Sequence, residues 1–269
     1  MDYLELLKLT LTAAVYPESA YQYIGPRSES TLRAMFQRTI VKLLNRRGIT
    51  LIKRTPYDRV LREGGRDWPS IGYTMVGLKR LQNVWDAIET IVREGVEGDF
   101  VETGVWRGGC SIFARACLNV YGEKNRLVWA CDSYEGLPKP DVAKYSADAG
   151  YDLSQNDYLS VPLPKVQENF RTFGLSEGVR FIKGWFRDSL PTAPIGKIAV
   201  LRLDGDLYES TMDALKALYD HVSPGGFVVV DDYGAWPPCK KAVHDFRDAR
   251  GITNEIIDVD GIGAFWRVG

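Results

Sequence analysis

From residue 98 onward the sequence alternates short apolar runs with helical segments, and this alternation constrains the fold more than any other feature. The apolar runs are nearly continuous, which is typical of strands that are buried on both faces of a parallel sheet. They cover residues 99–103, 126–132, 179–184, 197–204 and 225–232, and the helical segments cover 109–121, 163–173, 209–221 and 237–249. Two final runs, 255–259 and 263–268, are separated by Asp260-Gly261 and predict a hairpin. We therefore expect an α/β fold with a doubly wound, mainly parallel sheet and an antiparallel edge strand at the C-terminus.

The first 95 residues have a different pattern. Residues 30–47 and 74–93 place apolar side chains at helical spacing, and the second of these helices ends near Gly95. Between Arg27 and Arg66 there are eleven Lys or Arg residues and three acids. We interpret this basic stripe as a solvated helix face on a lid or a dimer arm; contact with an anionic partner or membrane surface is the alternative. The sequence thus predicts a helical N-terminal extension over 1–95, with possible contacts in a homo-oligomer, and a cofactor-binding catalytic α/β domain over 96–269.

Composition excludes several classes of protein. The formal net charge of −1 gives no general attraction to nucleic acid. No apolar run reaches the ~18 residues that a membrane-spanning helix needs, and the acidic start does not resemble a signal peptide. The four cysteines match no zinc motif, so we expect reduced thiols in a cytoplasmic protein.

The first strand runs into a glycine-containing loop. Ligands of such sheets bind beyond the carboxyl ends of the strands, and here residues 102–109 read Glu-Thr-Gly-Val-Trp-Arg-Gly-Gly. Glycines permit a tight turn and close approach of a ligand to the backbone. The spacing of Gly104 and Gly108 is not that of dinucleotide-binding loops, and no Gly-Lys-Ser/Thr follows to cradle a phosphate. The carboxylate of Glu102 instead suits the cationic amino-acid part of S-adenosylmethionine.

The next two strand ends suit an adenosine. An acid at the position of Asp132, followed by Ser133, can accept both hydroxyls of a ribose, although a helix cap or turn is the alternative. The third strand ends in Gly184-Trp185, where the indole could stack on an adenine or simply pack against the edge of the sheet.

The fourth and fifth strand ends carry paired acids. They are Asp204 and Asp206, and Asp231 and Asp232. Because consecutive strands here are expected to be neighbours, the four carboxylates should converge, and such crowding is costly without protons or a cation. Oxygen-only ligands favour Mg²⁺, whereas helix capping would explain only one or two of the acids.

A metal next to an adenosine cofactor suggests methyl transfer to a hydroxyl. Mg²⁺ can hold the hydroxyl oxygen and lower its pKa. Asp206 is then free to take the proton, provided that Asp204, Asp231 and Asp232 bind the metal.

At this point the sequence resembles the macrocin O-methyltransferase family of sugar methyltransferases in antibiotic biosynthesis. The resemblance covers residues 67–269, and ETGVWRGG, LRLDGDLYEST and VDDY occur in the family's order. It implies a class I methyltransferase fold and S-adenosylmethionine at residues 102–109 and at Asp132-Ser133. The candidate contacts in that loop are Glu102, Thr103, Gly104, Arg107 and Gly108.

The resemblance also implies Mg²⁺ on Asp204, Asp231 and Asp232, Asp206 as the base, with Asp204 as a second catalytic candidate, and a glycan or small-molecule hydroxyl as the acceptor. By analogy with catechol methyltransferases, Met75 would contact the methionine part of the cofactor. The first 65 residues and the segment 136–162 depart from the family pattern, and both lie where the acceptor would be recognised.

Two other functions remain open from the sequence. An NAD(P)-dependent oxidoreductase would need a Tyr-x-x-x-Lys or a hydride-relay His, and no such tyrosine motif lies near the strand ends. A non-catalytic protein with a methyltransferase fold would have little reason to retain four crowded carboxylates.

Overall fold

A computed structural model describes residues 2–15, 20–23, 32–55, 57–69 and 71–269. Seven strands form one sheet in the order β5-β4-β3-β6-β7-β9-β8. Their bounds are β3 (Asp99–Thr103), β4 (Val128–Asp132), β5 (Val179–Lys183), β6 (Ile198–Leu203), β7 (Val222–Val230), β8 (Ile257–Asp258) and β9 (Ala264–Arg267). The first five are parallel, and β9 pairs antiparallel with both β7 and β8. The predicted doubly wound sheet with antiparallel C-terminal strands is confirmed. The strand order reverses between β3 and β6, which is where ligands of such folds bind.

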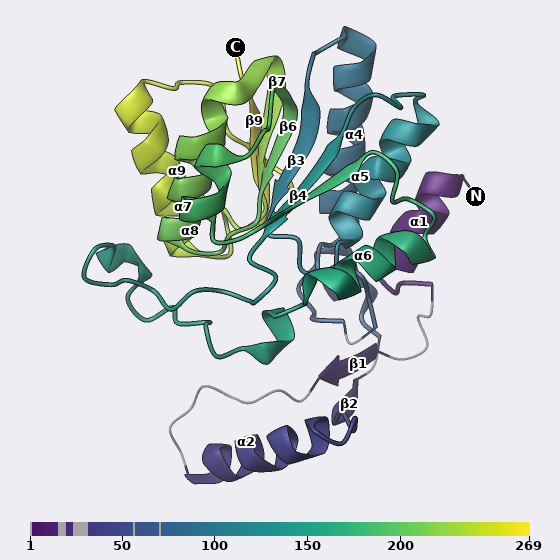
Figure 1. Ribbon diagram of the computed structural model, residues 1–269, viewed down its shortest axis with the longest axis vertical. Helices are drawn as coiled ribbons and strands as arrows, with labels where there is room; N and C mark the ends of the chain where they lie inside the picture. The colour runs from purple at the N-terminus through teal and green to yellow at the C-terminus, as the bar shows by residue number, and fades with distance from the viewer. Residues whose placement is uncertain (1, 16–19, 24–31, 56, 70) are drawn as a thin grey trace.

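Helices cover both faces of this sheet (Figure 1). One face is covered by α1 (Tyr3–Leu11), α4 (Leu78–Glu94), α5 (Gly109–Val120) and α6 (Leu163–Thr172). The other is covered by α7 (Phe186–Ser189), α8 (Tyr208–Leu218) and α9 (Pro237–Arg250). Successive strand residues point to opposite faces, so Phe100 of β3 joins the first core and Val101 joins the second. This double burial explains why the strands read as continuous apolar runs.

The N-terminal region contains two parts that differ in their packing. Leu4, Leu7 and Leu11 of α1 share the core of the first sheet face. The remaining elements are β1 (Ala20–Tyr23), α2 (Leu32–Asn45), β2 (Ile52–Thr55) and α3 (Arg59–Glu63). Figure 1 shows α2 and the β1–β2 pair apart from the helices that cover the sheet. The helix predicted over 30–47 and the start of the basic segment fall partly on residues 24–31, outside the described residues. The division of the chain at residue 95 stays a prediction.

The helix α4 begins later than predicted. The apolar spacing indicated a helix from residue 74, but residues 74–77 are not helical and α4 starts at Leu78. The amide of Gly109 donates to the carbonyl of Tyr73 at 3.0 Å, so this non-helical segment is tied to the start of α5. Met75 is thereby held beside the carboxyl end of β3. The other end of α4 agrees with the prediction, because Gly95 caps it with a left-handed φ of 66°.

The segment between β4 and α6 passes beneath the carboxyl ends of the strands (Figure 1). It contains two short 3₁₀ turns, η1 (Ser146–Asp148) and η2 (Asp157–Leu159). Two further 3₁₀ turns, η3 (Leu190–Thr192) and η4 (Tyr219–His221), follow α7 and α8. In the described parts of the chain no helix has the length and apolar character needed to cross a membrane. All four cysteines are buried and unpaired.

Candidate active site

Two cavities lie at the carboxyl ends of the strands. The first, which we call the β4 cavity, is bordered by Gly104, Asp132, Ser133, Gly184 and Trp185, which follow or end β3, β4 and β5. The second, the β7 cavity, is bordered by Asp204, Asp231 and Asp232 at the ends of β6 and β7, and by three tryptophans. Most of the residues predicted as candidate contacts therefore border one or both cavities.

The turn after β3 needs glycine because another strand end lies against it. Gly104 has a φ of 90°, and a Cβ built there would lie 1.7 Å from the carbonyl oxygen of Asp204. The amide of Asp204 donates to the carbonyl of Thr103 at 2.8 Å, which keeps the two strand ends together. Glycine is favoured at position 108 for a different reason: the absence of a Cβ makes room for Val166 and Phe170 of α6. Packing against α6 and a left-handed φ of 89° both favour glycine at this position, and contact with a cofactor stays a prediction.

Asp132 holds the loop that follows β3. Its Oδ2 accepts the amides of Val105 at 2.6 Å and Trp106 at 3.2 Å, and its Oδ1 accepts the amide of Tyr134 at 2.7 Å. Burial raises the pKa of Asp132, while these amide donors act in the opposite direction. Trp106 has a left-handed φ of 48°, which is a strained conformation for a residue other than glycine. The carboxylate therefore shapes the loop as well as bordering the β4 cavity, and its contact with a ribose stays a prediction.

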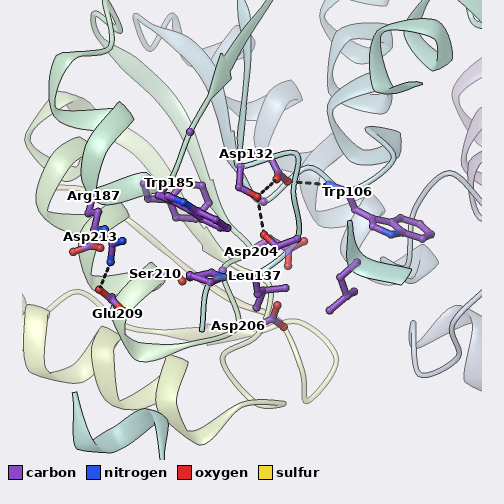
Figure 2. Close-up of a pocket in the computed structure, with 18 of the residues that line it drawn as sticks. Trp106, Asp132, Leu137, Trp185, Arg187, Asp204, Asp206, Glu209, Ser210 and Asp213 are labelled. Carbon is purple, nitrogen blue, oxygen red and sulfur yellow. Dashed lines mark hydrogen bonds and ion pairs between the residues drawn. The ribbon is translucent and has the colours of Figure 1, made fainter. Parts of the chain in front are cut away.

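Trp185 forms another wall of the β4 cavity. It directly follows Gly184, whose amide donates to the carbonyl of Asp132 at 3.0 Å, so the ends of β4 and β5 are joined here. Figure 2 shows the indole on one side of Asp132 and Trp106 on the other. This position suits the stacking of a planar ring, and stacking on an adenine stays a prediction.

The paired acids come together as expected from neighbouring strands. Leu203 at the end of β6 is in register with Val230 at the end of β7. Carboxylate oxygens of Asp204, Asp231 and Asp232 all lie within 4.8 Å of one another. Asp206 lies beside them, with its amide donating to Oδ2 of Asp232 at 3.0 Å.

Two buried arginines, which the sequence analysis missed, compensate part of this negative charge. Arg202 donates to Glu102 at 2.6 Å and to Asp204 at 2.9 Å, and it also pairs with Asp231. Arg80 of α4 pairs with the other oxygen of Asp231 and reaches Asp260 at 3.2 Å. An arginine inside the otherwise apolar run 197–204 was a sequence signal for such a buried partner.

Three acids of the cluster remain hard to ionise despite these arginines. Burial and the charge of Asp231 raise the pKa of Asp204 to about 6. Burial and the charges of Asp204 and Asp231 raise the pKa of Asp206 to about 8, and the pKa of Asp232 also rises well above its usual range. A carboxyl with a pKa near neutrality is suited to moving a proton.

The donor set fits a Mg²⁺ ion. All ligand atoms that Asp204, Asp231 and Asp232 offer are carboxylate oxygens, the type that Mg²⁺ prefers. Within the described chain no hydrogen bond reaches Oδ1 of Asp204 or Oδ1 of Asp232, so these two acids each retain a free oxygen, whereas both oxygens of Asp231 are paired with arginines. Among the described residues, the ion pairs of this cluster of six acids, which includes Glu102, Asp206 and Asp260, come from two arginines, Arg80 and Arg202, so acidic groups remain in excess for a cation to offset.

Four of the predicted cofactor contacts lie outside the β4 cavity. Glu102 is 1% exposed, and burial raises its pKa to about 7. Its carboxylate accepts hydrogen bonds from Arg202 and Ser111, and it borders the β7 cavity. Arg107 donates to the carbonyl of Gly72 at 2.7 Å and lies over the ring of Trp106. Thr103, Arg107 and Gly108 border neither cavity. The structure gives these residues roles in positioning the loop, and direct contact with a cofactor stays a prediction for them.

The β7 cavity has aromatic walls in addition to its acids. Trp68, Trp106 and Trp236 border it, and Trp68 stacks on Tyr158 with ring centroids 5.5 Å apart. The indole of Trp106 donates to the carbonyl of Tyr158 at 2.8 Å. Aromatic faces next to carboxylates suit a ligand that presents both C–H surfaces and hydroxyl groups.

The two cavities meet at a shared boundary. Five residues border both of them: Met75, Trp106, Leu159, Asp204 and Asp206. A ligand in one cavity can therefore approach a ligand in the other beside two carboxylates, which is the arrangement that a group-transfer enzyme needs.

Comparison with known proteins identifies the class. The solved structure of the O-methyltransferase NovP matches with a TM-score of 0.83 and 40% sequence identity, covering 99% of this chain and 98% of that chain. The protein is thus an O-methyltransferase, which removes the oxidoreductase and non-catalytic alternatives.

The family follows from a model described as Macrocin-O-methyltransferase (TylF), which matches residues 1–268. The chain belongs to this family. A relative from Streptomyces olivaceus, 8-demethyl-8-(2,3-dimethoxy-alpha-L-rhamnosyl)-tetracenomycin-C 4'-O-methyltransferase, is 54% identical over 76% of this chain and 78% of its own length. Mycinamicin III 3''-O-methyltransferase from Micromonospora griseorubida is 46% identical over 81% of this chain and 87% of its own length.

Proposed function

We propose that this O-methyltransferase moves a methyl group from S-adenosylmethionine to a sugar hydroxyl of a natural-product glycoside, with the help of Mg²⁺. The observation that carries the proposal is the meeting of the two cavities at Asp204 and Asp206. The β4 cavity would hold the methyl donor and the β7 cavity the acceptor.

The β4 cavity suits the donor because its walls match the parts of an adenosine. Trp185 offers a flat apolar face for the adenine, and Asp132 and Ser133 offer oxygen acceptors for the ribose hydroxyls. Met75 lies at the boundary of the two cavities, where the methionine part would point its methyl group toward the acceptor.

The β7 cavity suits a sugar because it combines tryptophan faces with carboxylates. The two relatives are named for methylation of sugar-bearing compounds, a rhamnosyl-tetracenomycin and mycinamicin III. We extend that acceptor class to this chain, and the particular scaffold and hydroxyl follow from the experiment below.

Asp204, Asp231 and Asp232 would hold the Mg²⁺ ion. When bound, the ion would supply Lewis-acid polarisation of an acceptor oxygen. Arg80 and Arg202 hold the Asp231 carboxylate in place from both of its oxygens.

Asp206 is proposed to accept the proton of the acceptor hydroxyl. The freed electron pair of that oxygen forms a bond to the methyl carbon, and the carbon–sulfur bond breaks with its electrons passing to sulfur. The products are a methyl ether, S-adenosylhomocysteine and protonated Asp206. Much of the acceleration comes from orienting the two substrates across the shared boundary.

The test combines turnover with binding. Purified protein is incubated with S-adenosylmethionine, Mg²⁺ and either the rhamnosyl-tetracenomycin or mycinamicin III, and mass spectrometry follows the gain of a methyl group. The matched control is the same scaffold without its sugar. Methylation of a glycoside but not of its aglycone supports the proposal; methylation of the aglycone would contradict a sugar acceptor.

Calorimetry with S-adenosylhomocysteine tests the donor site separately. We expect binding that is lost in Asp132→Ala and kept in Asp231→Ala. Equal binding of NAD and S-adenosylhomocysteine would count against the donor. Assembly into a homo-oligomer and a cytoplasmic location stay predictions.

A further inference from the structure

We propose that Asp148 is a positioning residue, which caps helix α8 from a distant segment and thereby holds Asp206 at the boundary of the two cavities. The inference rests on the proposed function, because that function assigns the proton transfer to Asp206. It concerns a residue that neither the sequence motifs nor the borders of the cavities point to.

Asp148 is fully buried and uses both carboxylate oxygens on one helix. It lies in η1, and its side chain is 0% exposed. Its Oδ1 accepts the amide of Tyr208 at 2.7 Å, and its Oδ2 accepts the amide of Glu209 at 3.1 Å. These are the first two residues of α8, whose amides have no partner within the helix.

Helix α8 cannot cap itself. Its N-cap residue is Leu207, an aliphatic side chain that makes no capping hydrogen bond. Ser, Thr, Asp and Asn normally occupy this position because their oxygens accept the free amides. Asp148 supplies those oxygens from 60 residues earlier in the chain, so the start of α8 depends on the segment between β4 and α6.

Asp206 lies directly before this cap and in a strained conformation. Its φ of 58° is in the left-handed region, which is uncommon for residues other than glycine, although aspartate adopts it more readily than most. Surrounding contacts hold it there. The carboxylate of Asp232 accepts its amide at 3.0 Å on one side. On the other side, the backbone continues through Leu207 into the two amides that Asp148 holds. Asp206 is therefore anchored between two carboxylates, and removing one lets the strained backbone relax.

The segment that carries Asp148 is held by ring contacts on either side of it. The ring of Tyr145 lies 5.6 Å from that of Tyr208, and the ring of Tyr151 lies 5.9 Å from that of Trp236. Trp236 borders the β7 cavity. The position of Asp206 is thus linked through Asp148 to the segment that forms part of the acceptor side.

The experiment compares Asp148→Ala with Asp148→Asn and with a control, Asp152→Ala. Asp152 lies in the same segment and accepts a backbone amide, that of Ser154, but it is exposed. Asp206→Asn serves as the reference for loss of the base. Three quantities are measured: kcat and KM with the rhamnosyl-tetracenomycin acceptor, the Kd of S-adenosylhomocysteine, and hydrogen exchange in peptides that cover residues 204–211.

We expect Asp148→Ala to lower kcat by on the order of 100-fold, the cost typical of a misplaced catalytic group. The Kd of S-adenosylhomocysteine should change far less than kcat: Asp148 itself does not border the β4 cavity, although Gly205 and Glu209, which its cap helps to hold, do. Exchange should rise at Tyr208, Glu209 and the peptide containing Asp206. Asp148→Asn keeps an oxygen acceptor for only one of the two amides and sets its NH2 group against the other, so its kcat should lie between those of Asp148→Ala and the wild type. Asp152→Ala should behave as the wild type.

Each contrary outcome has a distinct meaning. Unchanged exchange at Tyr208 and Glu209 in Asp148→Ala would overturn the cap. If exchange became faster at those two amides but kcat and the exchange of residues 204–207 did not change, the cap would stand. The proposal that the cap positions Asp206 would then be overturned. An active Asp206→Asn would remove the base itself, and with it both the proposed proton transfer and this inference. Hydrogen exchange is measured without an acceptor. It therefore tests the cap and its effect on residues 204–207 even if the chosen glycoside is not methylated.

Discussion

The β4 cavity and the β7 cavity are built in different ways. The core of the β4 cavity comes from residues that end or directly follow β3, β4, β5 and β6, such as Gly104, Asp132 and Gly184. The β7 cavity adds residues from four separate segments, for example Trp68, Leu153, Trp236 and Ile262. The β4 cavity is therefore built mainly around the strand ends, with Met75, Leu137 and Leu159 added from other segments, whereas the β7 cavity depends more on how surrounding segments are placed. Substitutions in these segments can therefore alter the acceptor specificity of the enzyme while its donor site stays intact.

The two cavities also differ in how they stabilise buried acids. In the β4 cavity, backbone amides surround the carboxylate of Asp132. In the β7 cavity, Arg80 and Arg202 pair with Asp231, and Arg202 also reaches Asp204. Backbone amides shape a rigid loop, whereas guanidinium groups leave a cluster whose net charge still attracts a cation. Four predictions test this contrast, in order of decreasing effect.

Removal of divalent metal should abolish methyl transfer but leave the donor site unaffected. Metal-ion stabilisation is commonly worth several kcal/mol, so treatment with EDTA should lower the rate by about 10³-fold or more, and Mg²⁺ should restore it. The Kd of S-adenosylhomocysteine, measured by calorimetry in the same buffer, should not change. Full activity in protein shown by elemental analysis to be metal-free would refute the assignment of Asp204, Asp231 and Asp232.

Replacement of Arg202 by methionine should destabilise the whole domain. Three acids lose their shared partner, and breaking a buried ion pair from one side typically costs about 3–5 kcal/mol of unfolding free energy. Urea denaturation followed by circular dichroism measures the loss. The control is Arg180→Met on β5, an exposed position where we expect little change. Equal stability of the two variants would show that the cluster does not need its arginine.

Replacement of Trp185 by alanine should weaken the donor site selectively. Stacking of a base on an aromatic ring is worth about 1–3 kcal/mol, so the Kd of S-adenosylhomocysteine should rise by about tenfold or more. Trp68→Ala removes a tryptophan that borders only the β7 cavity and should leave that Kd unchanged. Equal weakening by both changes would mean that the two cavities do not bind their ligands independently.

Replacement of Trp236 by alanine should have the smallest effect and act on the acceptor. Loss of one wall of the β7 cavity should raise the acceptor KM about fivefold, in line with about 1 kcal/mol for a single aromatic contact. The Kd of S-adenosylhomocysteine should be that of the wild type. Steady-state kinetics with the rhamnosyl-tetracenomycin acceptor provides the measurement. An effect on the Kd of S-adenosylhomocysteine instead would show that Trp236 contributes to the donor site and not only to the acceptor site.

The sequence by itself determined the sheet and the meeting of the acids. Continuous apolar runs predict doubly covered strands, and the run 197–204 followed by 225–232 predicts neighbouring parallel strands. Once those strands are adjacent, Asp204, Asp231 and Asp232 must meet, because both strands end at the same edge. These features depend on periodicity and on chain order, which a single sequence contains.

Only the tertiary structure decided which residues from remote segments support that site. Arg80 lies 151 residues from Asp231, and Asp148 lies 60 residues from the amide it caps. Periodicity does not reveal such pairs, because each depends on how an entire segment is placed against the sheet. The same limit explains why α4 was expected to start at residue 74: the non-helical lead-in is tied to α5 by the hydrogen bond from the Gly109 amide to the Tyr73 carbonyl, a contact that no local pattern encodes.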